Sequence, residues 1–352
     1  MIGIDLFSGA GGMSLGALSA GVDVQQVVEA DKYAAATYSA NHQPLHEVFA
    51  NDIRKYHHKP IQNRDNEGLI VFGGPPCQGF STSNQKTRSL DNDKNWLFQE
   101  FVRVVRETEP DWFVFENVRG ILETEGGMFV EQIVDEFEKL GFTVATKLLH
   151  AADFGVPQKR ARFFIIGSAH GITYQFPEPT HLTPITVADA ISDLPLLNNG
   201  ANQCLQSYAT KASSPYIKSM RGRKKSCSNH LITRNSDLIV ERYRHIPQGG
   251  NWENIPDELM KNYADKSRCH TGIYRRLKLD EPSVVIGNYR KNMLIHPTQN
   301  RGLSVREAAR LQSFPDNFVF KGSIGFQQQQ VGNAVPPLLA NKIFNKILQE
   351  YV

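Results

Sequence analysis

Short apolar runs alternate with amphipathic stretches over the first 170 residues of the chain. Six runs have the length and the β-branched or aromatic content of strands: Ile2–Phe7, Val24–Glu29, Leu69–Gly73, Trp112–Asn117, Thr143–Leu149 and Arg162–Ser168. Between them, four stretches have helical spacing: Met13–Ala20, Tyr33–Asn41, Leu97–Thr108 and Met128–Leu140. This alternation predicts an α/β fold with a doubly wound, mostly parallel sheet. Such sheets bind ligands at the carboxyl ends of their strands.

The periodicity weakens after residue 170, where Pro, Ser, Asn and basic residues accumulate. We therefore expect a second, smaller and loop-rich domain over residues 171–303. A helical pattern returns at Ser304–Ser313, and Pro337–Leu348 is typical of a helix with proline at its start. We expect residues 1–170, completed by 304–352, to form a catalytic and cofactor-binding domain.

The composition is that of an ordinary globular protein, with 40% hydrophobic and 21% charged residues in a chain of 352. No apolar run approaches the roughly 18 residues of a membrane span, and the N-terminus lacks the basic region of a signal peptide. The four cysteines (Cys77, Cys204, Cys227 and Cys269) show neither CxxC spacing nor a disulfide framework. This pattern favours a reducing compartment, and the cytoplasm of a prokaryote would suit.

The net charge of +3 hides an uneven distribution. Residues Gln203–Arg310 contain 20 Lys and Arg against 9 Asp and Glu, whereas the rest of the chain contains 19 against 27. A basic segment joined to an acidic body indicates that one part contacts a polyanion. A solvated charged face gives the same count. Both interpretations apply to Arg223, Lys224 and Lys225, which are candidate phosphate contacts.

The segment Asp5–Gly12, Asp-Leu-Phe-Ser-Gly-Ala-Gly-Gly, lies where a predicted strand ends and a helix begins. Glycines there let a ligand approach the backbone closely, and a helix N-terminus favours a negative group. Glu29 ends the second predicted strand, where a carboxylate can bind ribose hydroxyls. A nucleotide-like ligand is one interpretation. A tight turn that needs glycine is the other, because the spacing is not GxGxxG.

A cysteine stands in a stiff loop after the third predicted strand. The segment Gly73–Ser81 reads Gly-Gly-Pro-Pro-Cys-Gln-Gly-Phe-Ser, so two prolines precede Cys77. A lone cysteine is usually buried packing, but one held at a ligand crevice has the setting of a nucleophile. Glu116 ends the fourth predicted strand at the same edge. It is either a cap or surface residue, or an acid with a raised pKa.

These segments resemble the DNA (cytosine-5)-methyltransferase family of prokaryotic type. Its blocks occur in order at Asp5–Gly12, Glu29–Asp31, Asn51–Ile53, Gly74–Ser81, Glu116–Val118, Gln158–Arg162, Arg306–Pro315 and Gly332–Pro336. Pro-Pro-Cys-Gln followed by Glu-Asn-Val and Gln-x-Arg-x-Arg is a highly specific combination. The family keeps its target recognition domain in the gap between Arg162 and Arg306, which is also where the basic excess lies.

The resemblance implies methyl transfer from S-adenosylmethionine to carbon-5 of a flipped-out cytosine, in a specific sequence of double-stranded DNA. Carbon-5 is too weak a nucleophile by itself, so the thiolate of Cys77 would first add to carbon-6. The resemblance gives Glu116 the contacts to N3 and the exocyclic amine, and Arg162 the contact to O2. It gives Arg160 the ordering of the thiol and a phosphate.

The resemblance also implies sets of binding residues. Around the cofactor it places Phe7, Gly9, Gly11, Glu29, Asp52, Ile53, Pro75, Leu97, Asn333 and Val335. Candidate DNA contacts are Gln78, Ser81 and Ser83, together with Arg223, Lys224 and Lys225. We expect no metal, because the histidines His245, His270 and His296 lack metal-ligand spacing. We expect no membrane association, because no apolar run is long enough to span a membrane. We expect a monomer on DNA near the nucleoid, with a separate restriction endonuclease as a candidate partner.

Other functions stay open at this stage. An RNA cytosine methyltransferase would have a small recognition region and a Cys-Phe-Thr segment, and this chain has a long insert and no such segment. An inactive DNA-binding relative would not need intact Cys77, Glu116, Arg160 and Arg162. A nicotinamide dehydrogenase would share the glycine turn but would not explain Pro-Pro-Cys. The chain does not reveal its target sequence.

Overall fold

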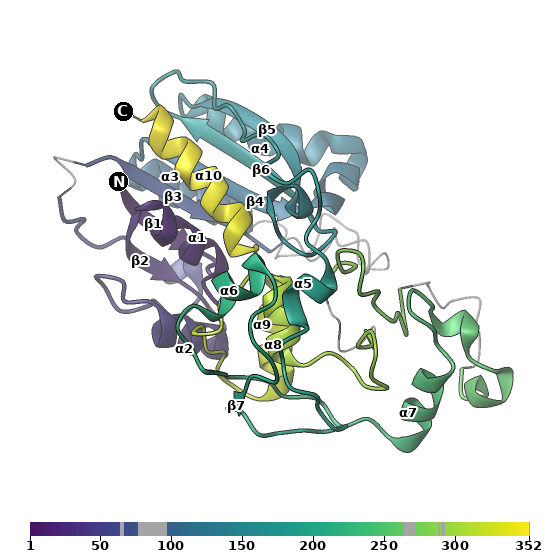
Figure 1. Cartoon of the computed structure of the whole chain (residues 1–352). Helices are drawn as coiled ribbons and strands as arrows, with labels where there is room; N and C mark the ends of the chain where they lie inside the picture. The colour runs from purple at the N-terminus through teal and green to yellow at the C-terminus, as the bar shows by residue number, and fades with distance from the viewer. Residues whose placement is uncertain (64–66, 77–96, 264–271, 288, 290–292, 352) are drawn as a thin grey trace. The chain divides into compact units, whose positions relative to one another are not determined.

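A computed structural model describes residues 1–63, 67–76, 97–263, 272–287, 289 and 293–351. The chain divides into two compact units (Figure 1). Unit 1 consists of Met1–Phe154, Ala161–Pro179 and Val335–Val352, and unit 2 of Gly155–Arg160 and Thr180–Ala334. Unit 2 therefore includes residues 304–334, which we had expected in the catalytic domain. The functional division of the chain into catalytic and target recognition domains stays a prediction.

Within the described residues of unit 1, six strands form one sheet. They are β1 Ile2–Leu6, β2 Asp23–Val28, β3 Leu69–Gly73, β4 Trp112–Val118, β5 Thr143–His150 and β6 Ala161–Ser168. The order is β2-β1-β3-β4-β6-β5, with β2, β1, β3 and β4 parallel and β6 antiparallel to both of its neighbours. The predicted mostly parallel α/β sheet is confirmed. Its central strands β1 and β3 are buried along their whole length because both faces are covered.

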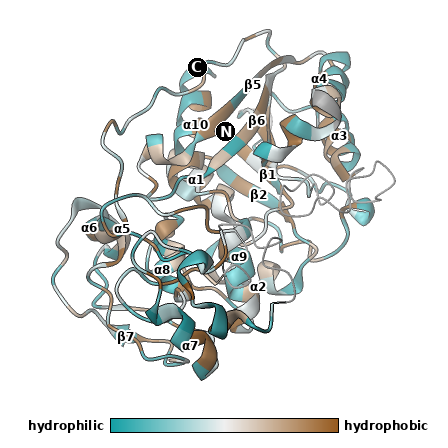
Figure 2. Ribbon diagram, turned by 90° about the vertical axis from the view of Figure 1, so that its right-hand side faces the viewer, coloured by the Kyte–Doolittle hydropathy of each residue, from teal (hydrophilic) through white to brown (hydrophobic). Residues whose placement is uncertain are grey.

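Helices pack on both faces of this sheet. The helices described in unit 1 are α1 Gly12–Ala20, α2 Lys32–Asn41, α3 Leu97–Thr108, α4 Met128–Lys139 and α10 Pro337–Glu350, with the 3₁₀ turns η1 Ile53–Lys55, η3 Arg119–Gly127 and η4 Ala151–Phe154. On one face, Phe113 of β4 stacks on Phe137 of α4, with ring centroids 3.9 Å apart. On the other, Phe72 of β3 meets Phe344 of α10 edge to face. Figure 2 shows the apolar strands at the centre of this unit.

The C-terminal helix α10 packs directly against α1, although more than 300 residues separate them in the chain. The contact needs glycine at position 16. A Cβ atom there would overlap the Ala340 side chain and the Pro337 carbonyl. The last segment of the chain thereby supports the helix that follows the first glycine-rich motif. Within the described residues, every helix is too short or too polar to cross a membrane.

Unit 2 is rich in loops, as its sequence predicted, but it also contains helices that the periodicity did not reveal. Its elements are α5 Val187–Ile191, α6 Pro215–Arg221, α7 Asp237–Arg244, α8 Val305–Leu311 and α9 Ile324–Asn333, the turns η5 Trp252–Asn254 and η6 Asp257–Met260, and the strand pair β7 Gln206–Ser207 and β8 Ser226–Cys227. Most of these helices are too short to show a 3.6-residue pattern. A capping signal was present: Ser214 accepts a hydrogen bond from Ile217 N, and Pro215 follows as the first helical residue.

Buried ion pairs hold the loops of unit 2 together. The Arg310 guanidinium donates to both Asp193 and Asp316, and all three side chains are fully buried. Arg301 forms a two-bond pair with Glu307, at 2.7 and 2.9 Å. These charges supply directional contacts where short strands offer few ladder hydrogen bonds.

We expect Asp193→Ala to lower the free energy of unfolding by about 3–5 kcal/mol, because it leaves part of a buried arginine without its partner. Urea denaturation measures this change. Glu241→Ala is the control, because it removes an exposed pair with Arg244 and should cost about 0–1 kcal/mol. Equal losses in the two variants would contradict a structural role for the buried pair.

Candidate active site

The sequence motifs of unit 1 meet at one edge of the sheet. The strands β2, β1, β3 and β4 are parallel neighbours, so their carboxyl ends lie side by side. At these ends stand Glu29 after β2, Asp5–Gly12 around the end of β1, Gly74–Pro75 after β3, and Glu116–Asn117 near the end of β4. The topology therefore gathers four motifs that are spread over more than a hundred residues of the chain.

The glycine-rich turn after β1 has a backbone that few residues adopt. Gly9 and Gly11 have φ of 57° and 88°, and Phe7 also has a positive φ of 57°, which is uncommon for a residue with a side chain. Glu29 fixes this turn. Its carboxylate accepts hydrogen bonds from the backbone N–H of Gly9 at 2.7 Å and of Asp31 at 2.6 Å. Burial raises the pKa of Glu29.

Asp5 also lies at this edge, although the sequence pattern did not predict it to be a site residue. It is 1% exposed, and Ser14 Oγ donates to its Oδ2 at 2.5 Å while Tyr38 Oη donates to Ser14 Oγ at 2.8 Å. Burial raises the pKa of Asp5 well above its ordinary value. Asp5 Oδ1 and Ser8 Oγ are buried without a hydrogen-bond partner among the described residues. The available signal was a carboxylate inside an otherwise apolar strand.

The other predicted cofactor residues have varied surroundings. Asp52 caps η1 by accepting from Arg54 N at 3.0 Å, and its hydrogen bonds with Arg54 lower its pKa to about 2. Ile53, Pro75 and Val335 are buried, Phe7 and Leu97 are partly buried, and Asn333 is exposed. All of these belong to unit 1 except Asn333, which ends α9 in unit 2. Their contacts with a cofactor stay predictions.

Glu116 and Arg162 form an ion pair at the sheet edge. In the antiparallel pairing of β4 with β6, Arg162 stands opposite Val118, which puts its side chain on the same face as Glu116. Arg162 Nε lies 2.7 Å from Glu116 Oε1, and the two side chains are 9% and 11% exposed. Burial raises the pKa of Glu116, although the Arg162 charge acts in the opposite direction. A carboxyl group in this setting can retain a proton.

The backbone that leads to Cys77 is held beside this pair. Gly74 lies so close to the Glu116 carboxylate that a Cβ atom at position 74 would overlap Oε2. Asn117 Nδ2 donates to the carbonyl of Pro75 at 3.2 Å. Cys77 itself, with Gln78, Ser81 and Ser83, lies outside the described residues. The prediction of Cys77 as the nucleophile therefore rests on its motif and on these neighbours.

Arg160 belongs to unit 2 and is 1% exposed. Its guanidinium donates to the backbone carbonyls of Ile286, Gly332 and Ala334. Its Nε is buried and has no hydrogen-bond partner among the described residues. The predicted contact of Arg160 with a thiol or phosphate is not tested by this geometry, which instead reveals a backbone-organising role.

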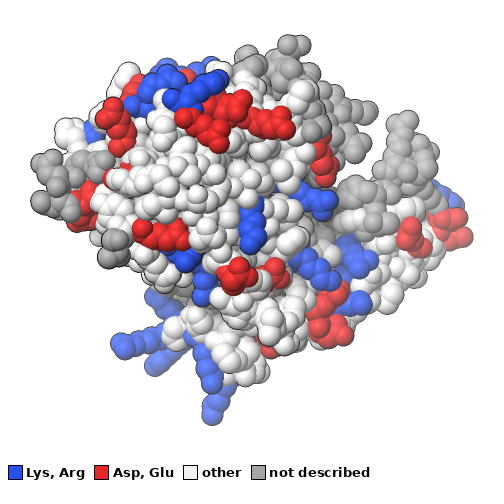
Figure 3. Space-filling view, turned by 90° about the horizontal axis from the view of Figure 1, so that it is seen from above, with Lys and Arg blue, Asp and Glu red and all other residues white. Residues whose placement is uncertain are grey.

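The basic excess of Gln203–Arg310 is only partly on the surface. Arg223, Lys224 and Lys225 are exposed, but Arg242, Arg276, Arg301, Arg306 and Arg310 are buried. Lys and Arg side chains nevertheless project in places from the molecular surface (Figure 3). The charge count along the chain thus overstates the number of cations that can face a polyanion.

Several side chains of unit 2 that carry potential chemistry are structural. Tyr274 and Tyr289, which stand next to cations in the sequence, are buried. His296 Nδ1 accepts from the backbone of Thr298 and Gln299, and burial lowers its pKa to about 4. Burial raises the pKa of the Cys227 thiol to about 11, which keeps it protonated. Among the described residues, no cluster of His, Cys, Asp and Glu has the arrangement of a metal site.

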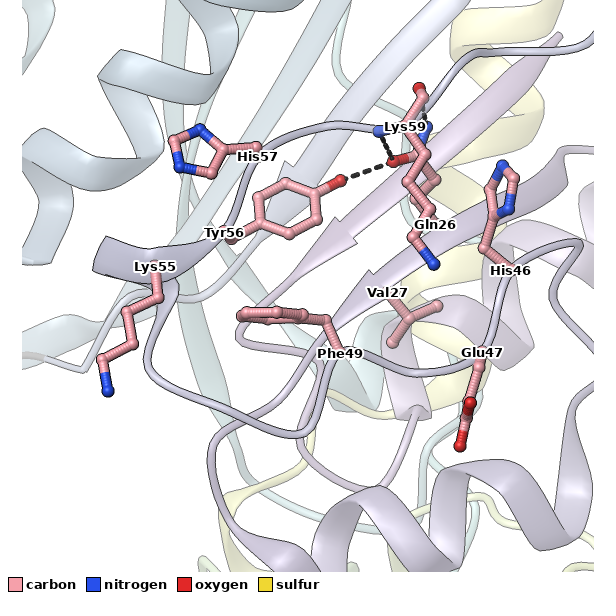
Figure 4. Close-up of a pocket in the computed structure, with 9 residues that line it drawn as sticks. All are labelled: Gln26, Val27, His46, Glu47, Phe49, Lys55, Tyr56, His57 and Lys59. Carbon is pink, nitrogen blue, oxygen red and sulfur yellow. Dashed lines mark hydrogen bonds between the residues drawn. The ribbon is translucent and has the colours of Figure 1, made fainter.

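A cavity of about 200 Å³ lies beside the edge strand β2 (Figure 4). In its wall, Gln26 Oε1 accepts from Tyr56 Oη and from the backbone N–H of Lys59, both at 2.7 Å. Phe49 packs against the Tyr56 ring in the same wall. The described residues that line it include none of those predicted to bind the cofactor, so the cavity is separate from that predicted set.

Comparison with known proteins identifies the arrangement. Residues 1–349 match the family model for C-5 cytosine-specific DNA methylase. The chain belongs to the C-5 cytosine-specific DNA methylase family. It is 41% identical to the type II methyltransferase M1.HphI of Haemophilus parahaemolyticus, over 98% of this chain and 86% of that protein. It is 34% identical to M.DdeI of Desulfomicrobium norvegicum, over 98% of this chain and 88% of that protein.

Solved structures agree with this assignment. A prophage-encoded E. coli protein, described as a DNA modification methyltransferase, matches this methylase with a TM-score of 0.79 and 26% identity over 99% of both chains. The Dnmt2 methyltransferase of S. pombe, at 14% identity and a TM-score of 0.61, covers 100% of this chain and 99% of its own, and shares the fold. The family resemblance drawn from the motif blocks is confirmed.

The methylase transfers a methyl group from S-adenosylmethionine to carbon-5 of cytosine in DNA, as members of its family do. The residues at the sheet edge fit this cofactor. The positive-φ turn at Gly9 and Gly11 lets a ligand approach the backbone. The buried polar atoms of Asp5 and Ser8 offer hydrogen bonds, and the Glu29 oxygens retain lone pairs for ribose hydroxyls.

We expect Glu116→Gln to lower kcat/KM for methylation by about 10²-fold or more, because the variant loses an acid that can donate to the base. Burial raises the pKa of Glu116, so the protonated form persists to higher pH than in an ordinary glutamate. Wild-type activity should therefore decrease as the pH rises through this raised pKa. The variant should lack that decrease.

Methyl incorporation measured across a pH series tests this expectation. The control is Glu123→Gln at an exposed position of η3, which should retain the wild-type profile. If wild type and Glu116→Gln had pH profiles of the same shape, the decrease of activity at high pH could not be assigned to Glu116.

Proposed function

We propose that this chain is a modification methyltransferase that methylates a cytosine within a specific sequence of duplex DNA, with Cys77 as its nucleophile. The Glu116–Arg162 pair is the observation that carries the proposal. It lies at the carboxyl edge of the sheet, against the Gly74 backbone, and Cys77 follows three residues later. A carboxyl group and a guanidinium can together bind the edge of a cytosine that carries N3, the amine and O2.

The residues divide the reaction as follows. The thiolate of Cys77 adds to carbon-6, and the electron pair of the 5,6 double bond makes carbon-5 nucleophilic. Glu116 donates to N3 and so stabilises the negative charge that develops in the ring, while Arg162 holds O2. S-Adenosylmethionine supplies an electrophilic methyl group on a sulfonium. As carbon-5 takes the methyl group, the bond between that group and the sulfonium would break and S-adenosylhomocysteine would leave. A base then removes the carbon-5 proton, and the bond between carbon-6 and Cys77 Sγ breaks to release the thiolate.

This chemistry requires the base to leave the helix. Cys77 must approach carbon-6 from above the plane of the ring, and a stacked, paired cytosine blocks that approach. Rotation of the nucleotide out of the duplex costs a few kcal/mol. The phosphate contacts that support a rotated strand would come from the cysteine loop, including Gln78, Ser81 and Ser83.

For the cofactor, we propose two groups of contacts. Phe7, Gly9 and Gly11 would surround the methionine part and the adenine, and Glu29 would bind the ribose. Asp52 and Ile53 would contact the adenine, and the pocket would be completed by Pro75, Leu97, Asn333 and Val335. The ordered, strained turn at Phe7–Gly11 and its bond to Glu29 support this placement.

The relatives support a proposal for the biological setting. M1.HphI and M.DdeI are type II methyltransferases of bacteria, which supports a modification role with a cognate endonuclease that acts separately. It also supports a cytoplasmic location close to the nucleoid. Recognition of the target would fall to residues 171–303, and the chain would act as a monomer on DNA.

Replacement of Cys77 tests the nucleophile. DNA from cells that express the chain should show 5-methylcytosine at one sequence by bisulfite sequencing, and DNA from cells with Cys77→Ala should show none. Purified Cys77→Ser should still bind cofactor and DNA, but should form no covalent complex with 5-fluorocytosine DNA. Cys204→Ser is the control, because this cysteine is exposed and free, and should methylate normally. Near wild-type methylation by Cys77→Ala would contradict the assignment.

Replacement of three exposed cations tests the DNA surface. The binding constant of the protein for a duplex that contains its target sequence should fall steeply with salt concentration, because each bound phosphate releases condensed counterions. Changing Arg223, Lys224 and Lys225 to Gln should reduce the slope of log K against log salt by about 0.9 for each phosphate that the variant no longer neutralises. The same change at Lys55, Lys59 and Lys139, exposed in unit 1, should leave the slope unaltered. An unaltered slope in the first triple variant would make that loop a solvated surface.

A further inference from the structure

Arg160 joins two segments of unit 2 that are distant in sequence. From one guanidinium, Nη1 donates to the carbonyl of Ile286 at 3.3 Å, and Nη2 donates to Gly332 and Ala334 at 3.0 and 2.9 Å. Ile286 lies in the predicted target recognition region. Gly332 and Ala334 flank Asn333, a predicted cofactor contact.

Two glutamines reinforce the same connection. Gln158 Oε1 accepts from Ile286 N at 2.8 Å, and its Nε2 donates to Gln312 Oε1 at 2.6 Å. Gln312 Nε2 in turn donates to the carbonyls of Val331 and Ala334, at 2.8 and 3.2 Å. The side chains of Gln158, Arg160 and Gln312 are all buried. A continuous set of hydrogen bonds therefore links the backbone at 286 with the backbone at 331–334.

The two backbones also touch each other. A Cβ atom at Gly332 would overlap the carbonyl of Gly287, so the segments approach as closely as glycine allows. The neighbouring Ser283 is held in register with the loop that carries Arg160: its N–H donates to Pro157 O at 3.0 Å, and its carbonyl accepts from Lys159 N at 2.8 Å. A displacement of residues 283–287 would thus act directly on residues 332–334.

We propose that Arg160 is a positioning residue that couples DNA binding to cofactor binding, by fixing the segment around Asn333 against the segment around Ile286. This inference rests on the proposed function. It assigns Arg160 an action through backbone carbonyls, in place of a direct contact with the reacting atoms. Arginine suits this position because its planar fork presents donors on two separate nitrogens to three carbonyls, whereas the donors of lysine all lie on one compact ammonium.

The experiment measures the dissociation constant of S-adenosylhomocysteine by calorimetry, with and without a duplex that contains the methylated sequence. For the wild type, the duplex should tighten cofactor binding by about tenfold, within the usual range of coupling between two sites. Arg160→Lys should bring this ratio close to one. Gln312→Glu should lower it as well, because it removes the amide donors to Val331 and Ala334 while nearly preserving the shape of the side chain.

Arg276→Lys is the matched control. Arg276 is likewise buried and donates to backbone carbonyls, including those of Tyr243 and Ile246. Its hydrogen bonds within the described part of the chain go to segments other than 331–334. Its replacement should destabilise the protein in the same way, as thermal unfolding would record, and should leave the coupling ratio intact.

Kinetics supply a second readout for the positioning role. Arg160→Lys should raise KM for the cofactor more than it lowers kcat at saturating cofactor, because a positioning residue acts on binding. An Arg160→Lys enzyme with wild-type coupling and cofactor affinity but a greatly reduced kcat would overturn the inference and make Arg160 a catalytic residue. Loss of coupling in Arg276→Lys as well would overturn it in favour of general destabilisation. Methyl transfer by the wild type is followed in the same samples, and its absence from every duplex would contradict the proposed function itself.

Discussion

Parallel pairing of β2, β1, β3 and β4 places four carboxyl ends at one edge of the sheet, and the candidate site depends on this arrangement. A parallel sheet is stable only when both of its faces are covered, so these strands are buried along nearly their whole length and helices flank them on either side. One of these helices, α10, comes from the end of the chain and packs on α1 at Gly16. The glycine turn is thereby supported by residues from both ends of the sequence.

Burial raises the pKa values of the acidic residues at this edge, and each of these residues has a different kind of hydrogen-bond partner. Desolvation raises the pKa of Asp5, Glu29 and Glu116 alike. Asp5 is paired with a hydroxyl, Glu29 with two backbone amides and Glu116 with a guanidinium. Perturbed carboxyl groups that gather at a sheet edge are typical of a functional site. Asp5 and Glu29 suit contacts with a cofactor, whereas Glu116 suits contacts with a cytosine.

Unit 2 uses charge in another way. Several of its arginines are buried, and they donate to carboxylates in the case of Arg310 and to backbone carbonyls in the cases of Arg160 and Arg276. Loops cannot satisfy their own carbonyls as helices and sheets do, so an arginine with five donors can replace several ladder hydrogen bonds. The loops of unit 2 are in this way held at several points, and two of these are the carbonyls of Gly332 and Ala334 on either side of Asn333.

The sequence by itself determined the strands and long helices of unit 1, because each is a local run with its own period, and it determined the family through the spacing of motif blocks. Short helices such as α6 show no helical periodicity in the sequence, although Ser214 and Pro215 are a capping signal for α6. Only the tertiary structure decided which charged side chains are buried. Arg223 and Arg276 look alike along the chain, yet one is exposed and the other buried. Likewise, Glu116 meets Arg162 through the antiparallel register of β4 and β6. Such partners are set by contacts between distant segments, which no local pattern encodes.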